Sequence, residues 1–112
     1  MTLFEKIIHR EIPATIVFEN DEMIAFRDIG PQAPIHILIV PKRPIPNMNA
    51  LNEDDSALVG RLILCAAEIA KIEGIADSGY RLTINCGKDG GQTVDHLHVH
   101  LLGGRALSWP PG

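Results

Sequence analysis

The chain has 112 residues, 46% hydrophobic and 21% charged, with a formal net charge of −4 at pH 7. This length predicts a single domain spanning residues 1–112. The negative charge, without a run of lysine or arginine, argues against nucleic-acid binding, which depends on neutralising phosphates. No apolar run approaches the roughly 20 residues of a membrane span, and the first residues lack a signal-peptide core. We therefore expect a cytoplasmic protein that does not bind membranes.

The first half of the chain predicts a short helix followed by three strands. Thr2 and Glu5 fit a capping box, which begins a helix at residue 3. Helical spacing, alternation and turn residues predict, in order, a helix over 3–9 and strands over 16–20, 23–28 and 35–41. The last of these is nearly continuously apolar, which is typical of a central strand. Its alternation places His36, Leu38 and Val40 on one face of the sheet.

The second half predicts one long helix and two further strands. The helix is expected over 54–73, capped by Asn52 or Asp54 and ended by Gly74. Gly60 within it indicates a close helix contact, since glycine there costs roughly 1 kcal/mol against alanine. Its buried stripe is predicted to be Leu58, Leu62, Cys65, Ile69 and Ile72.

The fourth and fifth strands are expected over 80–86 and 96–102, separated by a glycine-rich loop over 87–93. The two cysteines, Cys65 and Cys86, form no C-x-x-C pair, which excludes a zinc ribbon or dithiol redox motif. The fold class is therefore α+β, with an antiparallel five-stranded meander sheet, one short N-terminal helix and one long central helix.

Three histidines alternate with apolar residues in the last predicted strand, at His96, His98 and His100. A period of two places them on one face of a strand, with Leu97 and Val99 facing a core. Histidine changes charge near neutral pH and serves as base, nucleophile, acid or metal ligand. Three imidazoles in one row therefore predict a metal site or a metal-free catalytic site.

The loop before these histidines has the composition of a phosphate-binding loop. Gly90 and Gly91 permit close backbone approach, and successive backbone N–H groups can bind a phosphate. Gln92 and Thr93 add amide and hydroxyl donors, and Asn85 ends the neighbouring strand nearby. Together with the histidines, this loop favours a nucleotide phosphate as ligand.

The segment His96-Leu-His-Val-His-Leu-Leu102 resembles the signature of the histidine triad (HIT) superfamily. The resemblance extends to Asp28–Pro34, to Pro41-Lys42 and to Gly103-Gly104-Arg105 with the Trp109-Pro-Pro-Gly112 tail, all of which are similar to the histidine-triad nucleotide-binding (Hint) branch. It covers nearly the whole chain. The resemblance implies the HIT-like fold and a nucleotide-processing enzyme.

The resemblance implies that this protein is a purine nucleoside 5′-phosphoramidate hydrolase, an adenosine 5′-monophosphoramidase. His98 corresponds to the nucleophile that forms a nucleotidyl-histidine intermediate, which water then hydrolyses. Its other ring nitrogen donates to the backbone carbonyl of His96. His36 supports His96, and His100 binds phosphate or the scissile bridge. No cofactor and no metal ligand is implied.

The resemblance also implies the substrate-binding positions. Asp28 corresponds to an acid that accepts from the ribose hydroxyls. The other positions are Phe4, Phe26, Ile29 and Leu38 around the base, and Asn85, Gly91, Gln92 and Thr93 around the phosphate. A homodimer is implied in which two sheets join and Trp109 reaches the neighbouring site.

Two alternatives stay open. Zn²⁺ commonly takes three protein ligands and one open position, and the three histidines, with His36 from another strand, offer suitable atoms. The spacing of the outer histidines and the presence of Asn85 and Asp28 favour metal-free catalysis. The other alternative is a different nucleotide-binding HIT protein, either a diadenosine polyphosphate hydrolase, a nucleotidyl transferase or a non-enzymatic nucleotide binder.

Overall fold

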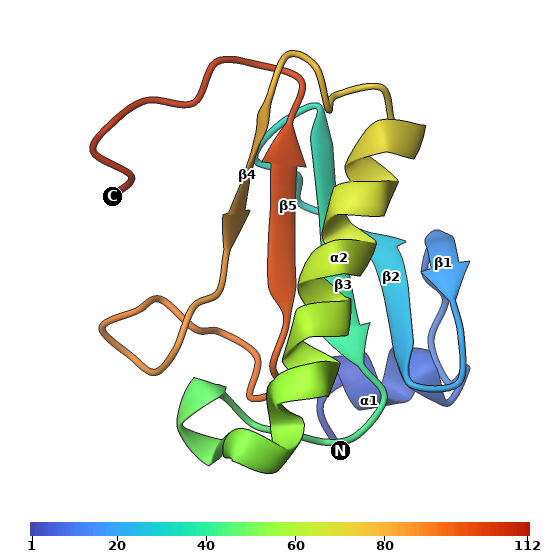
Figure 1. Ribbon diagram of the computed structural model, residues 1–112. Helices are drawn as coiled ribbons and strands as arrows, with labels where there is room; N and C mark the ends of the chain where they lie inside the picture. The colour runs from blue at the N-terminus through green and yellow to red at the C-terminus, as the bar shows by residue number, and fades with distance from the viewer.

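The computed structural model describes residues 1–112 and contains a five-stranded antiparallel sheet with strand order β1-β2-β3-β5-β4. Figure 1 shows the long helix α2 across one face of this sheet and the short helix α1 on the opposite side. The elements are α1 (Leu3–Ile8), β1 (Ile16–Glu19), β2 (Met23–Arg27), β3 (Ile35–Pro41), the 3-10 turns η1 (Met48–Ala50) and η2 (Glu53–Asp55), α2 (Ser56–Ile72), β4 (Tyr80–Thr83) and β5 (Val99–Gly103).

The predicted α+β class is confirmed, with one departure in strand order. The first three strands follow one another as hairpin neighbours, as a meander requires. After β3 the chain crosses the sheet through α2 and enters the edge strand β4, and β5 then returns between β3 and β4. This order makes the histidine-bearing strand β5 a central strand, with neighbours on both sides.

The strand β3 divides the interior into two cores. Ile37 and Ile39 pack in the larger core under α2, together with Leu97, Val99 and Leu101. Leu38 and Val40 pack on the other face in a smaller core that includes Phe4 and Ile7 of α1. The predicted alternation is therefore confirmed. Because apolar burial supplies most of the stabilisation, each face needs its own covering helix.

The helix α2 ends as predicted but begins later than predicted, at Ser56, after Asp55, which makes no side-chain capping hydrogen bond. Asn52 caps the preceding turn η2 in a capping box with Asp55, and Gly74 ends the helix at φ +76°. Ile72 is predicted in the buried stripe, but its side chain is 74% exposed because Ala66 and Ala70 fill that face instead. A Cβ on Gly60 would meet nothing within 4 Å, so the predicted close helix contact is absent from this chain.

The last two strands are shorter than the sequence predicts. β5 begins at Val99, whereas the prediction begins at His96. The segment before it leaves the sheet because the N–H of Leu97 donates to the carbonyl of Ile45, a loop residue, at 2.7 Å. β4 correspondingly ends at Thr83, which pairs with His100.

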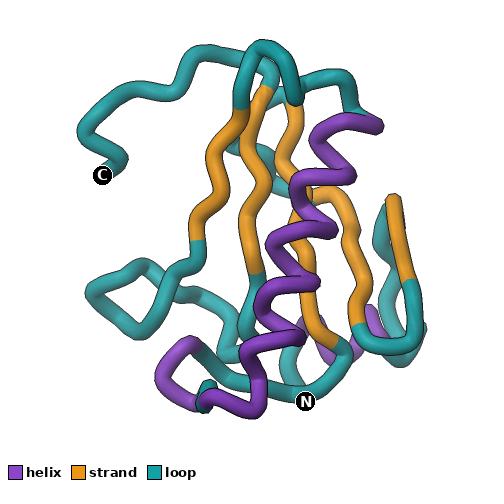
Figure 2. The backbone as a smooth tube through the Cα atoms, in the orientation of Figure 1, coloured by secondary structure: helices purple, strands orange, loops and turns teal.

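The segments between the strands form much of the periphery in Figure 2, including the long connection between β4 and β5. None of the helices combines the length and the apolar composition that a bilayer crossing requires.

Candidate active site

One cleft, with a volume of about 260 Å³, lies against the face of the sheet that carries α1. It joins residues of α1, of β2 and β3, and of the segment that leads into β5. Its lining contains eight of the fourteen predicted site residues. The lining residues are Leu3, Phe4, Ile7, Ile12, Pro13, Ala14, Phe26, Arg27, Asp28, Ile29, Leu38, Thr93, Val94, His98 and His100.

His98 is held in one orientation at the wall of this cleft. Its Nδ1 lies 2.6 Å from the carbonyl oxygen of His96, which only accepts, so Nδ1 carries the proton. Nε2 of the neutral ring therefore keeps its lone pair. Burial lowers the pKa of His98 from its usual value, although the hydrogen bond to the His96 carbonyl opposes that shift. The ring is thus neutral at pH 7, with Nε2 able to act as a nucleophile.

His96 has a supporting position rather than a place in the cleft. It is 1% exposed, and its Nε2 lies 2.7 Å from the carbonyl oxygen of Pro41 at the end of β3. The side chain thereby ties the segment before β5 to β3, and its backbone carbonyl orients His98. The three histidines lie on the opposite side of the chain from Leu97, Val99 and Leu101, as predicted, although only His100 lies within β5.

His36 contacts His100, and not His96 as the sequence-based interpretation expects. Nε2 of His36 lies 2.9 Å from Nδ1 of His100, because His36 on β3 and His100 on β5 occupy neighbouring strands. Burial lowers the pKa of His36 despite the opposing charge of Asp28. Burial, followed by the neighbouring His98 and His36, lowers the pKa of His100 to about 4. Both rings are neutral at pH 7.

Asp28 lies at the end of β2 on the rim of the same cleft. Its Oδ1 accepts a hydrogen bond from the N–H of Gly30 at 2.8 Å, which fixes the carboxylate. Its Oδ2 lies 3.6 Å from Nε2 of His36, beyond hydrogen-bond distance. Phe26 and Leu38 are buried cleft residues, whereas Ile29 is 96% exposed at the cleft edge.

The glycine-rich loop is closed by its own hydrogen bonds. Nδ2 of Asn85 donates to the carbonyl of Gly90 at 2.6 Å. The side chain of Gln92 accepts from the N–H of Gly87 and donates to the carbonyls of Pro46 and Val94. The side-chain amide of Gln92, which the sequence predicts to contact phosphate, therefore forms hydrogen bonds that stabilise the loop.

Of the predicted phosphate-binding residues, only Thr93 lines the cleft. Asn85, Gly91 and Gln92 lie outside its lining, so their direct contact with phosphate stays a prediction. Gly91 has φ +77°, a conformation that favours glycine, and a Cβ there would lie 3.8 Å from the Asn85 amide. Its conformation shapes the loop beside Asn85.

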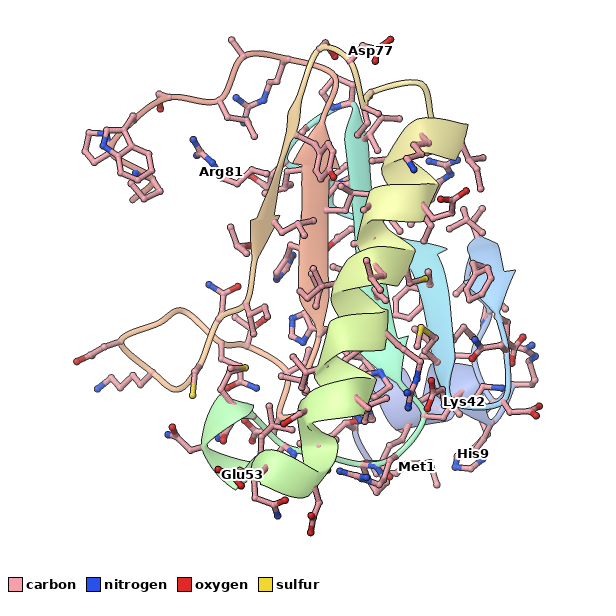
Figure 3. All side chains as sticks on the ribbon, in the orientation of Figure 1. Met1, His9, Lys42, Glu53, Asp77 and Arg81 are labelled. Atoms are coloured by element: carbon pink, nitrogen blue, oxygen red, sulfur yellow. The ribbon has the colours of Figure 1, made fainter.

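Trp109 does not reach the cleft of its own chain. It is 81% exposed, in a C-terminal segment that extends away from the sheet (Figure 1). The guanidinium of Arg81 on β4 donates to the carbonyl of Ser108 at 2.8 Å, and Figure 3 shows this side chain pointing toward that segment. The predicted contact of Trp109 with a neighbouring site therefore requires a second chain.

The sequence-based interpretation misses one wall of the cleft. The segment between α1 and β1 contributes Ile12, Pro13 and Ala14, none of which is among the predicted site residues. Three consecutive apolar residues in a predicted loop are the available signal, since an exposed loop is usually polar. These residues add apolar surface to the cleft lining.

The three residues whose possible metal-binding atoms lie close together are not the three histidines of the predicted triad. Asp28, His36 and His100 each offer one ligand atom, and these atoms lie within 4.8 Å of one another. Two nitrogens bound to a tetrahedral zinc would be about 3.3 Å apart, from bonds of about 2.05 Å. The two histidine nitrogens are 2.9 Å apart, a hydrogen-bond distance, so a metal would have to separate them.

Comparison with known proteins identifies the class to which this fold and this arrangement of histidines belong. The family model of the HIT domain matches residues 9–107, and the chain therefore belongs to the HIT family. It is 58% identical over 111 residues to an uncharacterized HIT-like protein of Synechococcus elongatus, covering 99% of this chain and 96% of that protein.

A second relative carries a functional name. The purine nucleoside phosphoramidase of Escherichia coli is 55% identical over 106 residues, covering 95% of this chain and 89% of that protein. Among solved structures, a HIT family hydrolase from Legionella pneumophila is similar over the full length of both chains, with a TM-score of 0.98 and 52% identity.

Proposed function

We propose that this protein hydrolyses purine nucleoside 5′-phosphoramidates through a covalent intermediate on His98, without a metal. The observation that carries the proposal is the hydrogen bond from Nδ1 of His98 to the His96 carbonyl, which leaves Nε2 as a lone-pair nucleophile at the cleft wall. The relative from E. coli, named a purine nucleoside phosphoramidase, supports the substrate class.

The reaction consists of two displacements at phosphorus. Nε2 of His98 forms a bond to phosphorus as the P–N bond of the substrate breaks, and the departing amine takes up a proton. Water then attacks phosphorus and loses a proton as the bond to His98 breaks. The products are the free amine and the nucleoside monophosphate. Dividing the displacement in this way replaces one difficult step by two easier ones.

The surrounding residues have separate tasks in this proposal. His100 donates a hydrogen bond to the phosphoryl group or the scissile nitrogen, where charge develops in the transition state. Asp28 binds the ribose hydroxyls from the rim. The purine occupies the apolar part of the cleft between Phe26 and the Ile12–Ala14 segment, where burial of its ring favours binding.

The protein is proposed to act as a homodimer joined at β4. Strand β4 is an edge of the sheet, and an unpaired edge can accept a second strand. The other edge strand, β1, has an irregular register and carries Glu19 in ion pairs with Arg10 and Lys42, features that discourage the addition of a strand there. Light scattering of the purified protein tests this state, and a monomer at micromolar concentration would contradict it.

The function is tested with a fluorogenic adenosine 5′-phosphoramidate in excess chelator. Wild type should hydrolyse it, His98→Ala should lose at least about a thousandfold in kcat, and His9→Ala should be unaffected. His9 is an exposed histidine outside the cleft (Figure 3). Wild type quenched in an alkaline denaturant should contain one added nucleotidyl group by mass, since the P–N bond of a nucleotidyl-histidine is labile in acid and survives at high pH. Activity that needs zinc, or that survives in His98→Ala, would contradict the proposal.

A further inference from the structure

The loop before β3 and the segment after β5 meet at one edge of the sheet. Ile35, the first residue of β3, pairs with Gly103, the last residue of β5. A Cβ on Gly104 would lie 2.9 Å from Cβ of Pro34, and the φ of Gly104 is +88°. Only glycine allows this turn to pack so closely, and the next residue, Arg105, is thereby directed at the loop.

Arg105 holds one residue of that loop. Its Nη2 and Nε donate to the carbonyl oxygen of Gln32 at 2.9 and 3.3 Å. The side chain of Gln32 also donates to the carbonyl of Gly30 at 3.0 Å. The backbone of Gln32 is therefore fixed by contacts on both sides, although the side chains of Gln32 and Arg105 have no part in the reaction proposed above.

The fixed backbone group of Gln32 points at a histidine. Its N–H donates to Nδ1 of His36 at 3.0 Å, so this nitrogen must offer a lone pair. A neutral imidazole carries one ring proton, and for His36 that proton is consequently on Nε2. Nε2 then donates to Nδ1 of His100, which lies 2.9 Å away. His100 in turn has its own proton on Nε2.

We propose that the N–H of Gln32, positioned by Arg105, sets the tautomer of His36 and through it makes His100 a donor at Nε2. His100 and His98 then have opposite tautomers on adjacent rings, whose centroids are 4.8 Å apart. One presents a proton to the substrate and the other a lone pair. Gln32 and Arg105 are positioning residues, since both act through His36.

The neutral state of both rings agrees with this arrangement. Burial lowers the pKa of His36 and of His100, so neither ring carries a second proton at pH 7. The reversed arrangement would place two N–H groups face to face at Gln32 and His36. An unpaired donor in a buried site is unfavourable because it loses its hydrogen bonds to water and gains none, which selects one tautomer. The role of His100 as a donor to the substrate rests on the proposed function, whereas the tautomers of His36 and His100 are a property of the protein without substrate.

The test is a long-range ¹H–¹⁵N correlation spectrum of the histidine rings at pH 7 without substrate. Protonated and bare imidazole nitrogens have well-separated ¹⁵N shifts. We expect a proton on Nε2 of His36 and His100 and on Nδ1 of His98. A proton on Nδ1 of His100, or an even mixture of its tautomers, would overturn the inference whatever the activity of the protein.

Two pairs of variants separate the positioning role from general loosening. Gln32→Pro removes the N–H, whereas Gln32→Ala keeps it and removes only the side-chain amide. Arg105→Met releases the Gln32 carbonyl, whereas Arg81→Met releases only the Ser108 carbonyl of the tail. Gln32→Pro and Arg105→Met should shift His36 and His100 toward mixed tautomers and leave His98 unchanged. Arg81→Met should match wild type, and Gln32→Ala, which keeps the N–H, should shift the tautomers less than Gln32→Pro.

The same variants should change kcat more than KM. The loss of one hydrogen bond predicts about a fivefold fall for Arg105→Met, and Gln32→Pro should fall further. Tautomer spectra of Arg105→Met that match those of Arg81→Met would remove Arg105 from the proposal. If Gln32→Pro does not fold, the wild-type and Arg105→Met spectra still decide. Correct tautomers without hydrolysis would contradict the proposed function and leave the tautomer inference standing.

Discussion

Phe4 packs edge-on against the imidazole of His98, with ring centroids 4.8 Å apart and an interplanar angle of 88°. The first turn of α1 therefore contacts a residue 94 positions later in the chain. Thr2 and Glu5 begin this helix through a complete capping box, which explains why so short a helix holds Phe4 firmly. Phe4 is 4% exposed and belongs both to the smaller core and to the cleft wall.

Phe4→Ala should therefore reduce stability and activity together. The substitution leaves a cavity in the smaller core and should cost about 3 kcal/mol in the free energy of unfolding. It also frees the His98 ring, so kcat should fall beyond any loss in folded protein. Denaturant unfolding and steady-state kinetics measure both effects. Phe18→Ala on β1, where the side chain is 37% exposed, should cost clearly less and spare kcat.

Gly90→Ala should disrupt the glycine-rich loop. A Cβ at this position would lie 2.4 Å from the carbonyl oxygen of Cys86, closer than any side chain tolerates. The loop must shift, and the hydrogen bond from Asn85 to the Gly90 carbonyl must lengthen. We expect a lower melting temperature and a higher KM.

Gly60→Ala is the matched control for Gly90→Ala. It adds the same methyl group in open space within α2, where it should stabilise the chain by about 0.5–1 kcal/mol. Equal melting temperatures for the two variants would contradict the steric argument.

The rate of hydrolysis should fall on the acidic side only below pH 6.5. Burial lowers the pKa of His98 beneath that ordinary value, so Nε2 keeps its lone pair as the pH falls through 6.5. Activity is lost only when the pH reaches the lowered pKa and Nε2 becomes protonated. Profiles of kcat/KM for a substrate that does not ionise in this range measure this fall directly. A half-maximal rate above pH 6.5 would contradict the prediction.

The free energy of unfolding should decrease as the pH falls from 6.5 toward 4. In this window the unfolded chain protonates His100, whose ordinary pKa is 6.5, while the folded chain, in which its pKa is about 4, does not. The unfolded state binds more protons, so acid favours it, and above pH 6.5 this residue contributes no slope. His100→Gln should reduce the pH dependence without abolishing it, because burial also lowers the pKa of His36 and of His98.

Asp28→Asn should raise KM for a ribonucleotide substrate about tenfold or more, as expected for hydrogen bonds to a charged group. The amide retains an oxygen for the Gly30 N–H, so the loop should keep its shape. A substrate lacking the 2′ and 3′ hydroxyls should bind wild type and variant alike. Equal discrimination by both proteins would show that Asp28 does not bind the ribose.

Sequence patterns predict local features of this fold well. The Thr2–Glu5 capping box, the alternation through β3 and the termination of α2 at Gly74 are all confirmed. Each depends on residues within one or two turns or on a fixed period, which sequence spacing reports directly. The predicted start of β5 is wrong because alternation continues through His96, while the backbone before Val99 bonds to Ile45 instead of a strand.

The sequence by itself identified the histidines as the candidates for chemistry, since three alternating histidines beside a glycine-rich loop are a poor choice for a strand face that is merely solvated. Only the tertiary structure decided how they divide the work. His36 and His100 are 64 positions apart and meet because β3 pairs with β5, which no local pattern encodes. The hydrogen bonds to backbone carbonyls and to Gln32 then fix where each ring proton lies. A sequence specifies an imidazole, but its partners in the folded chain decide whether a nitrogen donates or accepts.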